Sequence, residues 1–85
     1  MRHLLGNSSI SHTDLRQMFD SEEVQYYLRQ NATMIDGPED LQVRFVSNDD
    51  PTETLAVAWL FTGWQDAIIT LLVFNDILYV PDANC

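Results

Sequence analysis

The sequence contains no lysine, and its four arginines stand against thirteen aspartates and glutamates. The resulting formal charge of −9 creates a surface that nucleic acid and anionic membranes repel, so we expect direct binding to neither. A basic surface matches an acidic one, and we therefore expect the partner to be a basic DNA-binding protein or enzyme. The same charge also fits plain solubility or life at high salt, and composition does not decide between these readings.

Cysteine and long apolar runs are also scarce. The single cysteine is Cys85, so no disulfide can form within the chain, which fits a reducing compartment. The start lacks the apolar run of a signal peptide, and the longest apolar stretch, 67–74, falls far short of the roughly 20 residues that cross a bilayer. We expect a cytoplasmic protein with one domain over residues 1–85, beginning with a loose arm at 1–10.

Residue types that carry catalysis or bind metals are few. The two histidines, His3 and His12, have no cysteine beside them, whereas a zinc site needs about four ligands. Only three glycines occur, far apart, which excludes a glycine-rich phosphate loop. Ser11, His12 and Asp14 supply the residue types of a nucleophilic triad, but their adjacency is better explained by a helix start. We expect no enzyme, no cofactor and no metal.

The apolar content, in contrast, is that of a folded protein. In the first third of the chain the apolar residues have the spacing of a helix. Hydrophobic residues make up 46% of the chain. Ser11 and Asp14 resemble a capping box, with Asp in place of Glu, and apolar residues follow on one helix face. Residues 20–21 offer a second cap, followed by two glutamates that suit the positive end of a helix. The pattern predicts two short helices, 12–19 and 21–31, or one bent helix.

After Gly37 the apolar spacing changes to two, which predicts strands at 41–45, 55–61, 67–74 and 77–80. The third of these also has helical spacing, but its strand-forming residues and the two-residue turn after it favour a strand. We expect an α+β fold with one or two short N-terminal helices packed on a four-stranded antiparallel sheet. The last three strands carry more apolar side chains than one face needs. Either both faces are covered, or one face meets another molecule.

Most of the acidic residues gather in three groups, at turns or helix starts. Turns and helix caps favour acids for local reasons, which explains their positions but not the lack of lysine. None of the groups has the alternating acids and central glycine of a calcium loop. A second interpretation is a negative surface shaped like a phosphate backbone. The groups are Asp20 with Glu22 and Glu23, Asp36 with Glu39 and Asp40, and Asp49 with Asp50 and Glu53.

Three segments point to one family. Glu22-Glu23-Val24 is similar to a Pro-Glu-Glu-Val segment, residues 41–50 resemble a strand leading into an acidic turn, and Leu55 to Phe61 resemble a strand lining an apolar pocket. In these features the chain resembles the phage-type uracil-DNA glycosylase inhibitors, acidic proteins that mimic DNA. It departs from them in lacking lysine. The family's Glu-Ser-Ile edge strand would also fall near residues 13–15, which have a helical pattern here.

The resemblance implies an inhibitor that blocks a DNA-processing enzyme. Its carboxylates would engage a basic DNA groove, and its apolar pocket would capture an enzyme side chain. Trp64, in a turn, is well placed for contact. The expected partner-binding residues are Asp14, Asp20, Glu22, Glu23, Asp49, Asp50, Glu53 and Trp64. The expected pocket residues are Val24, Leu28, Val43, Val57 and Trp59. The alternative is a small structural or assembly subunit that forms a homodimer or larger homo-oligomer through its apolar sheet face.

Overall fold

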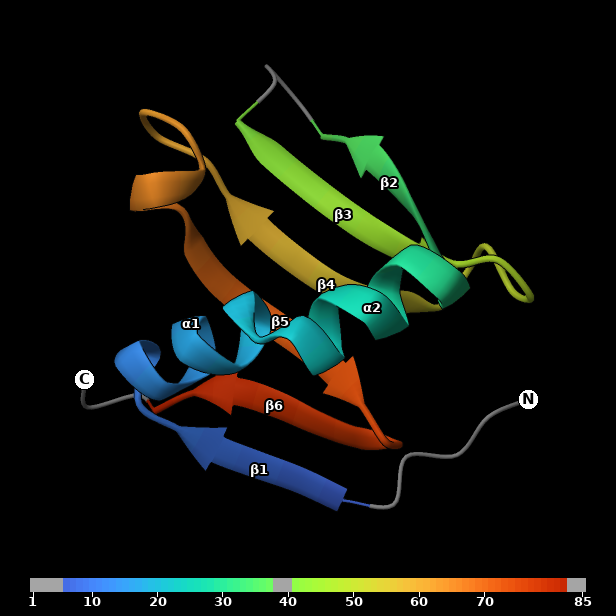
Figure 1. Ribbon diagram of the computed structural model, residues 1–85, viewed down its shortest axis with the longest axis horizontal. Helices are drawn as coiled ribbons and strands as arrows, with labels where there is room; N and C mark the ends of the chain where they lie inside the picture. Colours follow the sequence, from blue (N-terminus) through green and yellow to red (C-terminus); the bar gives the residue numbers. More distant parts are fainter. Residues whose placement is uncertain (1–5, 38–40, 83–85) are drawn as a thin grey trace.

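The computed structural model describes residues 6–37 and 41–82, which form two helices and six strands (Figure 1). Both helices lie near the start of the chain, and five of the six strands follow them. In chain order the elements are β1 (Gly6–Ile10), α1 (His12–Asp20), α2 (Glu22–Asn31), β2 (Ala32–Asp36), β3 (Gln42–Ser47), β4 (Thr54–Trp59), the short 3₁₀ turn η2 (Trp64–Asp66), β5 (Ile68–Phe74) and β6 (Ile77–Pro81).

Two serines set the limits of the helices. The Ser11 hydroxyl accepts a hydrogen bond from the Asp14 N–H at 3.1 Å and caps α1. The Ser21 hydroxyl accepts from the Val24 N–H at 3.2 Å and donates to the Met18 carbonyl at 2.7 Å. Ser21 therefore closes α1 and starts α2 without any further connecting residue. The two helices predicted from the sequence are confirmed, with ends shifted by at most one residue.

The predicted four-stranded antiparallel sheet is wrong, because the sheet has six strands and is mixed. The strand order is β1-β6-β5-β4-β3-β2, with β1 parallel to β6 and all other pairs antiparallel. The four strands expected from the sequence are present as β3, β4, β5 and β6. The two additional strands, β1 and β2, form the edges of the sheet.

The edge strands were missed because their sequences carry little strand signal. Residues 6–10, expected in a loose arm, read Gly-Asn-Ser-Ser-Ile and form a strand only by pairing with β6. A hydrogen bond from the Ser9 hydroxyl to the Asp82 carboxylate also ties β1 to the end of β6. Strand β2 follows α2 directly, without the turn residues that usually announce a strand. Residues 1–5 of the expected arm lie outside the described residues.

The segment 67–74, which the sequence left between helix and strand, is a strand. Strand β5 pairs with β4 on one side and with β6 on the other. The turn that joins β5 to β6 consists of Asn75 and Asp76, whose φ angles of 54° and 61° match a type I′ hairpin turn. The predicted two-residue turn is therefore confirmed.

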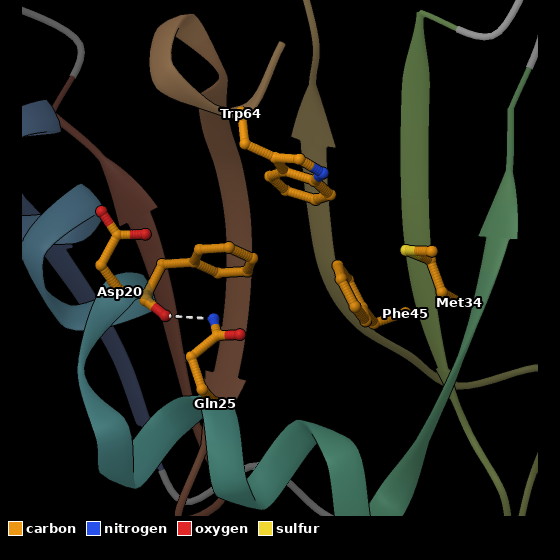
Figure 2. Close-up of a pocket in the computed structure, with 6 residues that line it drawn as sticks. Asp20, Gln25, Met34, Phe45 and Trp64 are labelled. Carbon is orange, nitrogen blue, oxygen red and sulfur yellow. Dashed lines mark hydrogen bonds between the residues drawn. The ribbon is translucent and has the colours of Figure 1, made fainter.

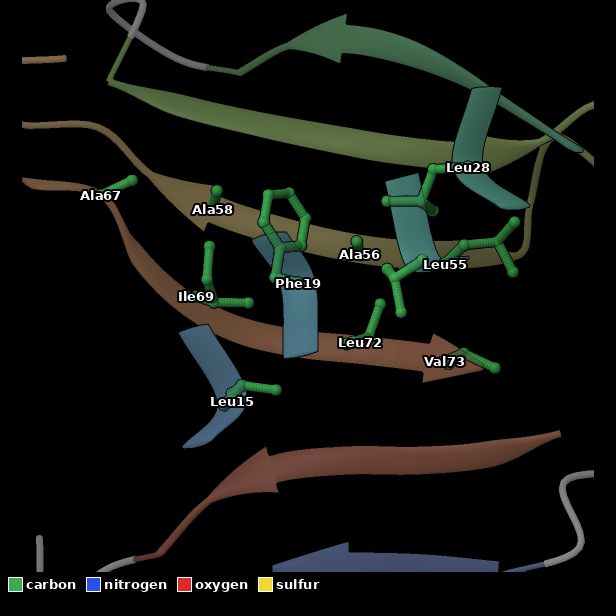
Figure 3. Close-up of a cluster of buried hydrophobic side chains, with 11 residues drawn as sticks. Leu15, Phe19, Leu28, Leu55, Ala56, Ala58, Ala67, Ile69, Leu72 and Val73 are labelled. Carbon is green, nitrogen blue, oxygen red and sulfur yellow. The ribbon is translucent and has the colours of Figure 1, made fainter. Parts of the chain in front are cut away.

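Both helices cover the same face of the sheet, and the core lies between these two layers (Figures 1 and 3). Ala56 pairs with Leu72 and Ala58 with Ile69, and all four side chains are buried in this core. Leu55, beside Ala56, is also fully buried, because a bulge leaves Leu55 without a partner in β3 and interrupts the alternation of the strand. The helices contribute Leu15, Phe19, Val24 and Leu28.

We predict that Ser21→Ala destabilises the protein more than Ser11→Ala. A lost helix cap costs about 1 kcal/mol of unfolding free energy, so we expect about 1 kcal/mol for Ser11→Ala. We expect up to about 2 kcal/mol for Ser21→Ala, because Ser21 also bonds the last turn of α1. Urea denaturation followed by far-UV circular dichroism measures both losses. Equal losses would show that Ser21 acts as an ordinary cap.

Candidate functional site

Three aromatic side chains from distant parts of the chain meet beside the helix junction, and Figure 2 shows two of them, Phe45 and Trp64. Phe19 of α1 lies edge-on to Phe45 of β3, with ring centroids 5.9 Å apart, and stacks with Trp64 of η2 at 6.0 Å. The centroids of Phe45 and Trp64 are 6.3 Å apart. Phe19 is buried, but Trp64 is 41% exposed, so the cluster is open to solvent on one side.

The open side of this cluster forms a hollow of about 600 Å³, within the range of about 300 to 1,000 Å³ typical of ligand sites. Its wall is mostly apolar, and its polar members are one carboxylate and one amide. The Gln25 amide donates to the Phe19 carbonyl at 2.5 Å and fixes α2 against the end of α1 (Figure 2). We call this site the apolar hollow, lined by Phe19, Asp20, Gln25, Met34, Phe45 and Trp64.

Arg16 of α1 fixes the backbone of η2, and with it Trp64, against α1. Its Nε donates to the Asp20 carboxylate at 2.7 Å, and Nη1 donates to the Ala67 carbonyl at 2.9 Å. Nη2 donates to the Trp64 carbonyl. Gly63 permits the turn into η2, because its φ of 125° is strained for any residue with a side chain. Arg16 and Gly63 thus position the indole of Trp64 without being part of the hollow.

A second hollow, of about 620 Å³, adjoins the first and is acidic. The two share Asp20 and Gln25. Glu22 and Glu23 are exposed in the first turn of α2, where the positive end of the helix stabilises their charges. We call this site the acidic hollow, lined by Asp20, Glu22, Glu23, Gln25, Tyr26 and Arg29. The helix junction therefore combines an aromatic cavity with a group of carboxylates.

The structure brings together four of the eight expected partner-binding residues at these hollows: Asp20, Glu22, Glu23 and Trp64. Asp14 lies in the first turn of α1, at the other end of that helix from Asp20. The remaining three, Asp49, Asp50 and Glu53, lie in the turn between β3 and β4.

The three acidic groups do not converge on one cluster. The turn with Asp49 and Asp50 adjoins the C-terminal end of α2, where the Asn48 N–H donates to the Asn31 carbonyl at 2.8 Å. Since α2 has ten residues, this group lies about 15 Å along the helix from Glu22. Asp36 lies at the opposite end of β3. Its neighbours Glu39 and Asp40 fall outside the described residues.

One acid in the β3–β4 turn has a clear local role. The Thr52 hydroxyl donates to the Asp50 carboxylate at 2.6 Å, and the Thr52 N–H donates to the same oxygen at 3.1 Å. These two bonds lower the pKa of Asp50 below its usual value, so this carboxylate keeps its charge at mildly acidic pH. Asp50 thus stabilises its turn while remaining exposed to a partner.

The expected pocket residues lie elsewhere than the hollows. Val24, Leu28 and Val43 are buried, and Val57 and Trp59 point to the sheet face away from the helices. The walls of the apolar hollow come instead from Phe19 and Phe45, which end the predicted helix 12–19 and the predicted strand 41–45, and from Met34 in the missed strand β2. The aromatic type of Phe19 and Phe45 was the available signal, but only the fold shows that they meet Trp64.

Comparisons with protein-family models, curated proteins and solved structures find no match to this chain. The resemblance to glycosylase inhibitors therefore stays a prediction. Within residues 6–37 and 41–82, no three His, Cys, Asp or Glu side chains form a group that could hold a metal ion. In the same residues, no helix has the length and apolar character to cross a membrane.

We predict that Arg16→Ala releases η2 from α1. Hydrogen bonds from a charged donor contribute about 1.5–3 kcal/mol each, so we expect a loss of at least about 2 kcal/mol in unfolding free energy. In a Trp59→Phe background, the emission of Trp64 should shift to the red as its indole moves into water. Arg29→Ala, an exposed arginine on α2, is the control. Unchanged emission in Arg16→Ala would show that Trp64 is held by its ring contacts alone.

Proposed function

We propose that this protein is an acidic inhibitor that mimics DNA and blocks a DNA-processing enzyme, with uracil-DNA glycosylase as the first candidate target. The observation that carries the proposal is the union of the apolar and acidic hollows at the helix junction. Protein interfaces obtain most of their affinity from a few buried apolar anchors, and their specificity from complementary charge. The helix junction offers both in adjoining positions.

The apolar hollow supplies the anchor. Its rings leave room for an apolar side chain of the partner, which would cover the exposed part of Trp64 and remove apolar surface from water. Tryptophan is the residue type most enriched among binding hot spots. The hydrogen bonds of Arg16 fix this residue before binding, so little conformational entropy is lost when the partner arrives.

The carboxylates supply the likeness to DNA. One group, Asp20 with Glu22 and Glu23, lies at the start of α2, and the group at Asp49 and Asp50 lies at its end. The separation of about 15 Å is the length that four or five phosphates of one DNA strand cover, at about 3.4 Å each. Arginines and lysines that bind a phosphate row can therefore pair with both groups. Arg16 pairs with Asp20, so the net negative charge at the start of α2 comes from Glu22 and Glu23, and Arg29 of the acidic hollow opposes part of it.

The proposed position of the carboxylates differs from that in the inhibitor family. The family's Glu-Ser-Ile edge strand has no counterpart near residues 13–15, which belong to α1. The edge strand that precedes α1 is β1, whose Gly-Asn-Ser-Ser-Ile sequence has no carboxylate. The proposed carboxylates therefore lie in two groups, at the two ends of α2, rather than along a sheet edge. Other enzymes with basic DNA-binding surfaces, such as nucleases and CRISPR effectors, remain targets within the same proposal.

We predict that the protein stops a bacterial uracil-DNA glycosylase from acting on uracil-containing DNA when the two proteins are equimolar. Strand cleavage after base excision is the readout. Inhibition should weaken as salt rises, because charge pairing is screened. Full glycosylase activity with the protein in large excess would eliminate this target, and the same assay would then be run with a nuclease and a CRISPR effector. A DNA mimic occupies the DNA-binding surface of its target. If the protein bound an enzyme and that enzyme could still bind DNA, the proposed mimicry would be wrong.

For an enzyme that is inhibited, we predict separate losses from the two hollows. Trp64→Ser should cost about 2 kcal/mol of binding free energy, as expected for a hot-spot tryptophan. Glu23→Gln should cost up to about 1 kcal/mol, mainly at low salt. Asp36→Asn removes one charge that lines neither hollow and is the control. Equal effects of Glu23→Gln and Asp36→Asn would mean that net charge, rather than the helix junction, determines binding.

A further inference from the structure

The sheet face away from the helices has an apolar surface with exposed side chains. Ile35, Arg44, Val57 and Leu71 pair in register across β2, β3, β4 and β5, and Trp59 pairs with Ile68 in the next row. Their strand neighbours Ala56 and Ala58 face the helices, so these six side chains face the opposite way. We call this surface the open sheet face, defined by Ile35, Arg44, Val57, Trp59, Ile68 and Leu71.

Three large apolar side chains of the open sheet face remain in contact with water. Ile35 is 46% exposed, Ile68 43% and Trp59 39%. They come from three strands, and Val57 and Leu71 lie half-buried between them. An exposed apolar surface of this kind usually marks a site of protein association.

Charge is distributed unevenly between the two faces. Asp36 is the only acid in the six strands, and it pairs with Val43, the partner of the core residue Ala58, so it lies toward the helix face. No strand position of the open sheet face therefore carries a carboxylate, and Arg44 is its charged residue. In a chain of charge −9, this is the face through which a second copy can approach with the least repulsion.

The outline of the protein sets an upper limit on the area that a dimer can bury through this face. Viewed down its shortest axis, with the sheet face-on, the protein extends 33 by 27 Å (Figure 1). An ellipse of these dimensions covers roughly 700 Å² for the outline of the whole protein, so a contact that reaches the about 800 Å² each partner buries in a stable complex must use most of this face. Two sheets that pack face to face form a sandwich with interdigitated side chains about 10 Å thick.

We propose that two copies of this chain pack through their open sheet faces into a symmetric β-sandwich dimer, with Trp59 and Ile68 at the interface. The helix layers then lie on the outside, so each dimer presents two copies of the apolar and acidic hollows on opposite sides. The dimer leaves the hollows free and does not depend on the proposed inhibition. The dimer uses the same apolar sheet face as the homo-oligomeric subunit considered from the sequence. It does not imply that the protein has a structural or assembly function.

Sedimentation equilibrium of the protein alone tests this. We expect a mass of about twice 9.8 kDa at micromolar concentration, and at least a tenfold weaker dimer for Trp59→Lys and for Ile68→Lys. Tyr26→Lys introduces the same charge at a 61% exposed aromatic residue on α2 and should leave the mass unchanged. Circular dichroism establishes that each variant is folded.

Two results would overturn the proposal. One is a monomer at concentrations up to about 100 μM, which would leave the open sheet face to a different protein. The other is a dimer that Trp59→Lys and Ile68→Lys leave intact, which would place the contact elsewhere. Because no enzyme is present, either result leaves the proposed inhibition untouched.

Discussion

The direct junction of α1 and α2 at Ser21 is the constraint on which the candidate site depends. One hydroxyl serves the end of one helix and the start of the next, so no loop separates Asp20 from Glu22. The sharp turn also brings the Gln25 amide to the Phe19 carbonyl. A longer connection would move the carboxylates away from the aromatic rings. The apolar and acidic hollows therefore adjoin because Ser21 caps both helices at one residue, and not because of the overall surface charge.

The acidic side chains and the exposed apolar side chains lie mainly on different sides of the protein, the helix layer and the open sheet face. Most acids outside the strands occupy first turns of helices and loops, where local hydrogen bonds and helix dipoles favour them, as the bonds of Asp50 with Thr52 illustrate. The strands need apolar and β-branched residues on both faces, but two short helices can cover only one of them. The strong segregation of charge is therefore built into the fold, and each surface suits a different kind of contact.

The sequence predicted those elements whose signals are local. Caps and apolar spacing located both helices, and alternation located β3, β4, β5 and β6. It missed β1 and β2, because edge strands such as Gly6–Ile10 acquire their structure from a neighbour rather than from their own propensity. For the same reason it placed Glu22, Glu23 and Trp64 among the contact residues but not Phe19, Met34 and Phe45. Which side chains share a hollow depends on contacts between residues far apart in the chain, and no spacing rule encodes those.

The two proposed contacts respond to salt in opposite directions, which makes them separable within one molecule. Pairing of the α2 carboxylates with a basic enzyme weakens as ions screen it, over a Debye length of about 10 Å at 0.1 M. Packing of two open sheet faces is mainly apolar, and it is opposed by repulsion between two chains of charge −9. Screening removes that repulsion, so added salt favours the dimer while it releases the enzyme. If both proposals hold, low salt favours enzyme binding and high salt favours the dimer.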